Sequence, residues 1–380
     1  MIIQIPKLIA VSVIATCSSQ AMAVTITDLG VLSGDISSYA RSINNKGEVV
    51  GNSFSGNGYS HAFIYTNNGI SELGSYSGYV YNTSAVSIND SSQSVGNVRT
   101  GGSPYSDNYA VQYYNQSLSN LFGITGLNGT IYPGMGGTSA TSINNNGQVA
   151  ASQYNSGYHA VIVGNGVVTN IGTLGGNYSY SNSINDQGQV VGSSNLSNGN
   201  GISHAFLYSN GSMTDLGTIA GGVSSSATSI NEKGQVVGSS AATDGNNHAF
   251  LYDNGNMLDL GTLNGFNSVA TSINENGQIV GSFGFSENLH SYAHAFLYSN
   301  GTMFDLNTLA GVIDSGWNLI DATAINDLGQ IVGQGQINGQ YHAYMLSSVA
   351  TVPVPASIVL IASGLLGFLP FSRRKCRAFD

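Results

Sequence analysis

Charged side chains are scarce in this chain of 380 residues. Lys, Arg, Asp and Glu together account for 7% of it, whereas an ordinary soluble domain is charged at roughly one residue in four. Nine Lys and Arg residues cannot form the basic surface with which a nucleic-acid-binding protein neutralises phosphates. The composition therefore excludes nucleic acid as a partner.

Cysteine is almost absent as well. The two cysteines, Cys17 and Cys376, lie close to the chain ends, so the body between Val24 and Val352 contains none. Disulfides, thiolate catalysis and cysteine metal sites are excluded there, and the stability of the body must come from a large core. The same body holds four basic and 18 acidic residues, which makes it strongly acidic.

Glycine and apolar residues are abundant instead. The chain contains 51 glycines and 21 tyrosines, and 41% of its residues are hydrophobic. That apolar content is too high for a disordered protein. The length allows one large domain or two ordinary ones, so the chain is expected to fold.

Residues 1–23 have the features of a signal peptide. Lys7 is their only charge, Leu8–Ala15 form a short apolar core, and Ala21 and Ala23 are small residues at the cleavage positions. The mature chain is expected to begin near Val24. The alternative is a lipoprotein cysteine at Cys17, although the residue before it is not the Gly or Ala that such a site usually carries.

Residues 351–380 have the features of a sorting segment. Pro353 and Pro355 precede an uncharged apolar run at 356–371, whose 16 residues span about 24 Å as a helix, short of a hydrocarbon core of about 30 Å. We predict a thin transmembrane helix there, in the inner membrane. The basic residues after it hold that end in the cytoplasm by the positive-inside rule: Arg373, Arg374, Lys375 and Arg377.

This three-part tail resembles the PEP-CTERM sorting signal of Gram-negative bacteria. The resemblance implies recognition by an exosortase, cleavage near the prolines, and release to the cell surface or extracellular matrix. Val354 departs from the pattern, because the family usually has Glu at that position. The alternative is an ordinary C-terminal anchor.

A sevenfold internal repeat fills the body. Its first marker is an Ile-Asn pair, usually within Ser-Ile-Asn (SIN), followed by a turn and an apolar run such as Gln235–Gly238. Asn at the first turn position and Gly at the fourth fit a type I turn, so each copy predicts a tight hairpin; only Ser92 replaces the glycine. The seven isoleucines are Ile43, Ile88, Ile143, Ile184, Ile230, Ile273 and Ile325.

Two further markers complete the unit. Six histidines begin a His-Ala-Phe-like (HAF) run, and Tyr109 replaces the histidine in the second copy. An Asp-Leu-Gly-like (DLG) motif begins eleven residues later, as Asp215 follows His204. The constant interval and pairs such as Asn210–Gly211 predict a hairpin with a two-residue type I′ turn. The histidines are His61, His159, His204, His248, His294 and His342.

Four short strands in about 47 residues match one blade of a β-propeller. The last unit lacks its DLG strand, while the chain begins with a spare one at Thr25–Gly30, which can complete the last blade and remove free sheet edges. We predict an all-β, seven-bladed β-propeller of four-stranded blades over 24–350, closed by its N-terminal strand. The structural alternative is an open β-repeat array.

The repeats resemble those of the bacterial HAF-repeat family of exported proteins over nearly the whole body. The resemblance implies an extracellular repeat protein and no particular reaction. We therefore expect a secreted or membrane-anchored protein, located at the surface of a Gram-negative bacterium, with a structural, adhesive or binding role.

The repeated histidines are interpreted as structural. A residue repeated around a ring usually serves the repeated blade, and each histidine is expected to hydrogen-bond within its own blade, to a Ser of SIN or an acid of DLG. His290 lies outside the pattern, four residues before His294, and that spacing makes a zinc pair only on a helix. We expect no metal and no cofactor; turn chemistry explains the Asn, Asp and Gly residues better than calcium does.

Function is expected on the variable loops of one rim. The turns within SIN and HAF hairpins are nearly constant in length, whereas the two connections on the opposite rim vary. Two long loops there carry the candidate ligand-binding residues, for which exopolysaccharide is a possible partner: Tyr132, Asp314, Trp317 and Asp321. The second hypothesis is a carbohydrate-binding or carbohydrate-active propeller that uses the loops near Trp317; the alternative for Trp317 is that it plugs the end of the ring. No hydrolase carboxylate pair or nucleophile motif is visible.

Overall fold

A computed structural model describes residues 24–74, 80–100, 108–114, 117–121, 137–154, 156–197, 201–263, 265–287 and 290–348. The predicted signal peptide, the predicted transmembrane helix at 356–371, and Tyr132 lie outside these residues. No helix among the described residues has the length and apolar character needed to cross a membrane.

The described chain forms seven antiparallel sheets of four strands each. The first three blades contain these strands, from innermost to outermost: β2 (Asp35–Ile43), β3 (Val49–Ser55), β4 (Ser60–Thr66) and β5 (Gly69–Glu72); β6 (Val80–Ile88), β7 (Ser94–Thr100), β8 (Asn108–Tyr114) and β9 (Ser117–Asn120); β10 (Thr138–Ile143), β11 (Val149–Tyr154), β12 (Tyr158–Gly164) and β13 (Val167–Asn170).

Blades 4 to 6 follow the same order, and two short helices come after the sixth: β14 (Gly175–Ile184), β15 (Val190–Leu196), β16 (Ser203–Ser209) and β17 (Ser212–Gly217); β18 (Ser225–Ile230), β19 (Val236–Ala241), β20 (Asn247–Asp253) and β21 (Asn256–Gly261); β22 (Asn267–Ile273), β23 (Ile279–Glu287), β24 (His290–Ser299) and β25 (Thr302–Asp305); η1 (Leu306–Thr308) and α1 (Ala310–Ile313).

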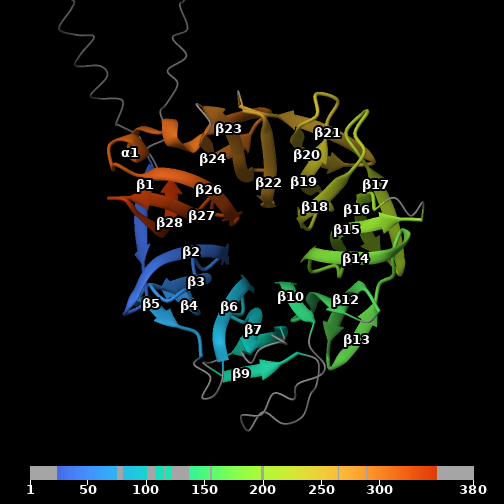
Figure 1. The fold of residues 1–380 in the computed structure, drawn as a ribbon, viewed down its shortest axis with the longest axis horizontal. Coiled ribbons are helices and arrows are strands. Elements are labelled where there is room, and N and C mark those ends of the chain that lie inside the picture. Colours follow the sequence, from blue (N-terminus) through green and yellow to red (C-terminus); the bar gives the residue numbers. More distant parts are fainter. Residues whose placement is uncertain are drawn as a thin grey trace, which may run out of the picture. The chain divides into compact units, whose positions relative to one another are not determined.

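The seventh blade joins the two ends of the described chain. Its sheet has the order β26 (Asn318–Ile325), β27 (Ile331–Ile337), β28 (Gln340–Ser348) and β1 (Val24–Gly30). β1 pairs antiparallel with β28, from Val24 opposite Ser348 to Gly30 opposite Ala343. Figure 1 shows the blades as a ring with the SIN strands innermost. The predicted closed seven-bladed propeller is confirmed, and the open array is not observed.

The turns have the predicted conformations. In the first SIN hairpin the Gly47 N–H donates to the Asn44 carbonyl over 3.0 Å, and Gly47 has a φ of +78°. Ser92, which replaces that glycine in the second copy, has a φ of +62°, a region that disfavours residues with a Cβ. Asn210 and Gly211 both have positive φ, as a type I′ turn requires.

The core lies between neighbouring blades, since each sheet is covered on both faces. Val49 and Val50 are consecutive in β3 and both fully buried, and the HAF aromatic Phe63 of the next strand is buried with them. Leu29 of the closing strand packs in the cluster between the seventh and first blades. Consecutive buried apolar residues are typical of strands in sheets that are covered on both faces.

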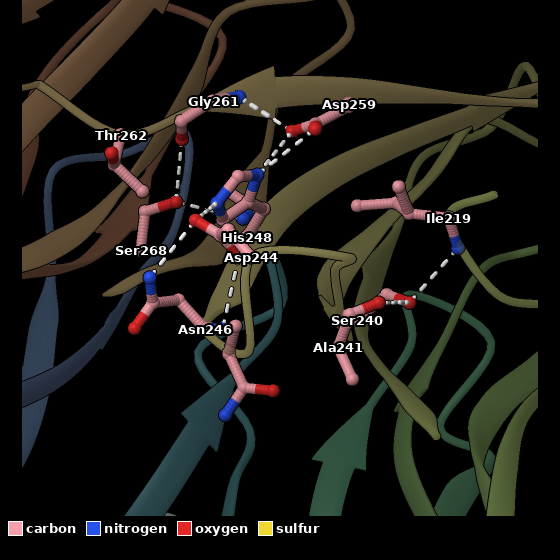
Figure 2. Close-up of polar contacts among 12 residues, drawn as sticks. Ile219, Ser240, Ala241, Asp244, Asn246, His248, Asp259, Gly261, Thr262 and Ser268 are labelled. Carbon is pink, nitrogen blue, oxygen red and sulfur yellow. Dashed lines mark hydrogen bonds and ion pairs between the residues drawn. The ribbon is translucent and has the colours of Figure 1, made fainter. Parts of the chain in front are cut away.

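A buried hydroxyl links most neighbouring blades. The Ser268 hydroxyl on β22 accepts the Ala249 N–H of the preceding blade. It donates to the carbonyl of Gly261, as Figure 2 shows. Between the seventh and first blades, the Ser38 hydroxyl accepts the Ala343 N–H and donates to the carbonyl of Gly30. Ser268 and Ser38 thus each satisfy two backbone groups of the blade before them. The residues that accept the HAF alanine N–H in this way are Ser38, Thr83, Thr138, Ser179, Ser225 and Ser268.

Candidate functional site

The HAF histidines lie at the start of the third strand of their blades, where most contact a carboxylate. His204 Nδ1 lies 2.9 Å from Asp215, the DLG acid eleven residues later. His342 makes the same contact with Asp28 of the closing strand. His61 is different, because its partner is Asp35 on the innermost strand of the blade. His159 is followed by Asn170 at the DLG position, so its blade lacks this ion pair.

His248 is held by two carboxylates, as Figure 2 shows. Its Nδ1 lies 2.9 Å from the DLG acid Asp259, and its Nε2 lies 3.2 Å from Asp244 in the preceding loop. Desolvation lowers the pKa of His248, but the hydrogen bonds and charges of Asp259 and Asp244 outweigh it and leave that pKa raised. The imidazolium form can donate from both nitrogens, so this position favours the charged ring.

A closed ring of asparagines surrounds the central axis of the propeller. It lies where each innermost strand ends in its SIN motif. Each SIN asparagine donates from its side-chain nitrogen to the backbone carbonyl of the SIN asparagine in the next blade, as Asn231 donates to Asn274 over 3.2 Å. The series closes when Asn326 donates to Asn44 over 3.0 Å. All members are buried: Asn44, Asn89, Asn144, Asn185, Asn231, Asn274 and Asn326.

The following residue of each turn forms a second ring. Its side-chain oxygen accepts the backbone N–H of the equivalent residue in the preceding blade, as Glu275 accepts from Glu232 and Asn45 accepts from Asp327. Burial and the negative charges of neighbouring members raise the pKa of Glu232, against the backbone N–H of Asp186, which lowers it. The seven members, five of them acidic, are Asn45, Asp90, Asn145, Asp186, Glu232, Glu275 and Asp327.

The carboxylates of the second ring hydrogen-bond to backbone N–H groups of neighbouring turns. Within the described part of the chain, no three His, Cys, Asp or Glu side chains are arranged to hold a metal ion. The pocket bounded by both rings has a volume of about 180 Å³. Because the ring carboxylates accept backbone N–H groups, the geometry accounts for them without a bound cation.

A larger pocket lies further along the innermost strands, and we call it the axial pocket. Its volume is about 440 Å³, and its walls come from all seven blades. Thr228, Thr271 and Thr323 line it three residues before their SIN asparagines, and Arg41 occupies the same position in the first blade. The Arg41 guanidinium lies over the Tyr39 ring, 4.5 Å from its centroid.

Asp321, one of the predicted ligand-binding residues, is used to position Tyr39. Its carboxylate accepts the Tyr39 hydroxyl over 2.9 Å and the Gln334 N–H over 2.8 Å. Burial raises the pKa of Asp321, against those hydrogen bonds and the charge of Arg41, which lower it. Asp321 therefore fixes the aromatic ring on which Arg41 lies.

Trp317 and Asp314 are not brought together with Asp321 as one exposed site. The Trp317 ring is partly buried against the core cluster of the seventh blade, with its centroid 6.2 Å from that of the buried Tyr344. A Cβ on Gly335 would come within 2.8 Å of that ring, so the glycine is needed there. Asp314 is exposed and ends α1. Trp317 thus packs within its blade, while Tyr132 lies outside the described residues.

A cluster of tyrosines lies on the variable rim between the third and fourth blades, and we call it the tyrosine surface. It consists of Tyr154, Tyr158, Tyr178 and Tyr180. Tyr158 contacts Tyr154 edge to face at 5.2 Å and the tilted ring of Tyr180 at 5.4 Å, measured between centroids. Tyr154 is 56% exposed and Tyr180 41%. Burial and the neighbouring Tyr158 and Tyr178 raise the pKa of Tyr180.

Backbone contacts hold the tyrosine surface in place. The Tyr154 N–H donates to the Gly137 carbonyl over 2.8 Å, and a Cβ on Gly157 would lie 3.1 Å from the Tyr178 ring. The sequence interpretation missed this cluster, because its members come from two blades and belong to no repeated motif. The only available signal was the concentration of tyrosine near two neighbouring variable loops.

Comparisons with known proteins identify the fold and no closer relationship. No protein-family model matches the chain, and no curated protein matches it. Among solved structures, a puromycin-hydrolysing peptidase from Mycobacterium tuberculosis is similar, with a TM-score of 0.53 and 10% identity over 86% of this chain and 55% of that one. This chain therefore spans about half the length of that peptidase.

Two further structures match over most of both chains. The β-propeller domain of the Trilobed protease from Pyrococcus furiosus has a TM-score of 0.51 and 8% identity over 85% of this chain and 99% of that one. An oligogalacturonate lyase in complex with manganese has a TM-score of 0.52 and 10% identity over 88% of this chain and 95% of that one. At these identities the likeness concerns the propeller fold alone.

Proposed function

We propose that the protein is an exported β-propeller that binds polysaccharide at a bacterial surface or in the extracellular matrix, where it has a structural or adhesive role. The observation that carries this proposal is the tyrosine surface on the variable rim. A tyrosine ring packs against the apolar face of a sugar, while its hydroxyl hydrogen-bonds to sugar hydroxyls. Exposed aromatic rings gathered on a rigid rim are costly unless a ligand covers them.

The arrangement of the tyrosine surface suits an extended polymer. Tyr154 and Tyr180 lie on either side of Tyr158 and are both exposed, so they can contact neighbouring sugar units. The side chains lose little conformational freedom on binding because tyrosine has only two side-chain torsions. The acidic body also favours contacts through aromatic and hydroxyl groups over direct pairing with the charges of an acidic polymer, since like charges repel. Binding without turnover is the proposed activity, so no catalytic residue is assigned.

The location proposed for the protein depends on the two chain ends. The signal peptide at 1–23 and the PEP-CTERM-like segment at 351–380 support export, temporary anchoring in the inner membrane and processing by an exosortase-like protease. Fractionation of cells tests this. The full-length chain should reach the surface or medium, and replacing Arg373, Arg374, Lys375 and Arg377 with Gln should retain it in internal fractions. A wild-type protein found only in the cytoplasm would refute export.

Polysaccharide pull-down with product analysis separates the proposed function from the carbohydrate-active alternative. Full-length protein should be retained by a surface polysaccharide without shortening it. Trp317→Ala and Asp314→Ala should leave that retention unchanged once samples are matched for folded protein, because Trp317 packs within its blade. Loss of retention in those two variants with the tyrosine surface intact would move the site to their loops, and turnover would establish an enzyme.

A further inference from the structure

The axial pocket has the composition of a ligand site that is distinct from the tyrosine surface. Its volume of about 440 Å³ falls in the range of small-molecule sites, roughly 300–1,000 Å³. Its walls are formed by side chains on seven rigid strands, a placement that holds ligand-contacting groups more precisely than loops do. We propose that this pocket binds an acidic sugar unit, a hexuronate, with its carboxylate on Arg41.

Arg41 is the positive group of this pocket, and its charge is not neutralised by direct contact. Among the described residues, no hydrogen bond or ion pair engages its guanidinium, whose contact is with the face of Tyr39. Tyr39 is in turn fixed by its hydrogen bond to Asp321. A guanidinium that contacts only a ring face keeps N–H groups available for hydrogen bonds to a carboxylate.

Most of the other polar groups of the pocket can accept hydrogen bonds. Thr228, Thr271 and Thr323 donate their hydroxyl hydrogens to backbone carbonyls of the next blade over 2.6–2.9 Å. Their oxygens therefore remain as acceptors. Asn182 likewise donates its side-chain nitrogen to Ala227, which leaves its side-chain oxygen as an acceptor.

This pattern specifies the class of ligand. The N–H groups of Arg41 require an anion as their partner. The hydrogen-bond acceptors around them require several hydroxyl donors on the same molecule. Inorganic sulfate or phosphate provides the charge but few donors, and a neutral sugar provides donors without the charge. A hexuronate has both. The second ring lies beyond the asparagine ring, and its five carboxylates disfavour an anion at that end, so the ligand is expected to reach the pocket from the variable rim.

Isothermal titration calorimetry on the full-length chain tests the inference. Galacturonate and glucuronate should bind, while galactose, glucose and sulfate should bind at least tenfold more weakly. Arg41→Gln should weaken hexuronate binding at least tenfold, because it removes the guanidinium donors. It should change the melting temperature little, because Arg41 is exposed and the substitution removes only its contact with the Tyr39 ring. Arg41→Lys should give an intermediate loss, since lysine keeps the charge but not the planar fork.

Lys46→Gln is the matched control, because it removes one positive charge from the SIN turn of the same strand pair, and Lys46 does not line the axial pocket. It should leave hexuronate affinity unchanged. The inference is overturned if hexuronates do not bind, if Arg41→Gln binds them as the wild type does, or if galactose or sulfate binds equally well. Polysaccharide binding by the tyrosine surface is also measured for the Arg41→Gln variant. The two measurements show separately whether hexuronate binding by the axial pocket and polysaccharide binding by the tyrosine surface occur.

Discussion

The SIN asparagine performs several tasks with one side chain. In Asn231 the oxygen accepts the N–H groups of Lys233 and Gln235 within its turn, and the nitrogen donates to the Gln235 side chain and to Asn274 of the next blade. The same amide thus closes the local hairpin and joins neighbouring blades. Aspartate could not replace it, because an ionised carboxylate has no donor.

Asn231→Ala should destabilise the protein by about 2–3 kcal/mol, because several buried backbone and side-chain groups lose their partner at once and each unsatisfied group costs about 1–3 kcal/mol. Urea unfolding measures the change. Asn256→Ala, which removes an exposed asparagine from the outermost strand of the same blade, serves as the control and should change stability by about 0.5 kcal/mol or less. Equal effects of both substitutions would show that the ring does not contribute.

His248 should give the protein a pH-dependent stability. Its pKa is raised in the folded state, so its contribution is fully present below the unfolded-state value of about 6.5 and is lost as pH rises through the higher folded-state pKa. Hydrogen bonds from Asn246 lower the pKa of the partner Asp244, so that carboxylate stays ionised at these pH values. The stability difference between wild type and His248→Gln should therefore be larger at pH 5.5 than well above the folded-state pKa, as urea unfolding at both values would show.

His159→Gln is the internal comparison for that experiment, since Asn170 stands at its DLG position. Its stability difference from the wild type should vary less with pH. A His248→Gln difference that grows as pH rises would contradict the account, because it would mean that the neutral ring is the stabilised form.

At the scale of the strand, the closure of the ring depends on β1. This strand is 314 residues away in sequence from its HAF partner, as the contact between Asp28 and His342 illustrates. Its DLG leucine, Leu29, is 2% exposed and packs with Val332 of its own blade and Phe63 of the first blade. The closing strand therefore contributes to the core as well as to the sheet.

Leu29→Ala should cost about 2–5 kcal/mol, the usual range when a buried leucine is replaced by alanine. Leu258→Ala is the matched control, because Leu258 also lies in an outermost strand but is 51% exposed, and it should cost far less. Thermal and urea unfolding of the two variants measures the difference. Similar small losses for both would show that β1 is only loosely attached.

The strands and turns were predictable from the sequence, whereas the loops were not. Short-range rules set the Asn-Gly and SIN turns, and the repeat supplied seven SIN turns and four Asn-Gly turns. Trp317 has no such repetition, so its burial against Tyr344 could not be distinguished from exposure. The asparagine ring was also missed, because each Asn reads locally as a turn former and its partner in the next blade is 41 to 55 residues away, or 282 across the closure.

At the scale of the whole molecule, the two rims have different properties. The SIN rim is filled by two closed rings of hydrogen bonds that are repeated in every blade. The opposite rim carries the tyrosine surface, which belongs to two blades only. The contacts repeated in every blade therefore account for stability, and binding is proposed at a surface that is not repeated.

The affinity of the full-length chain for its surface polysaccharide tests the proposed function most directly. Affinity electrophoresis should show wild-type binding and a loss of at least about 30-fold in the Tyr154→Ala, Tyr180→Ala double variant, the effect of removing an aromatic contact worth about 2 kcal/mol. Tyr341→Ala, which truncates a comparably exposed tyrosine of the seventh blade, should bind as the wild type does. Wild-type affinity in the folded double variant would contradict polysaccharide binding by the tyrosine surface.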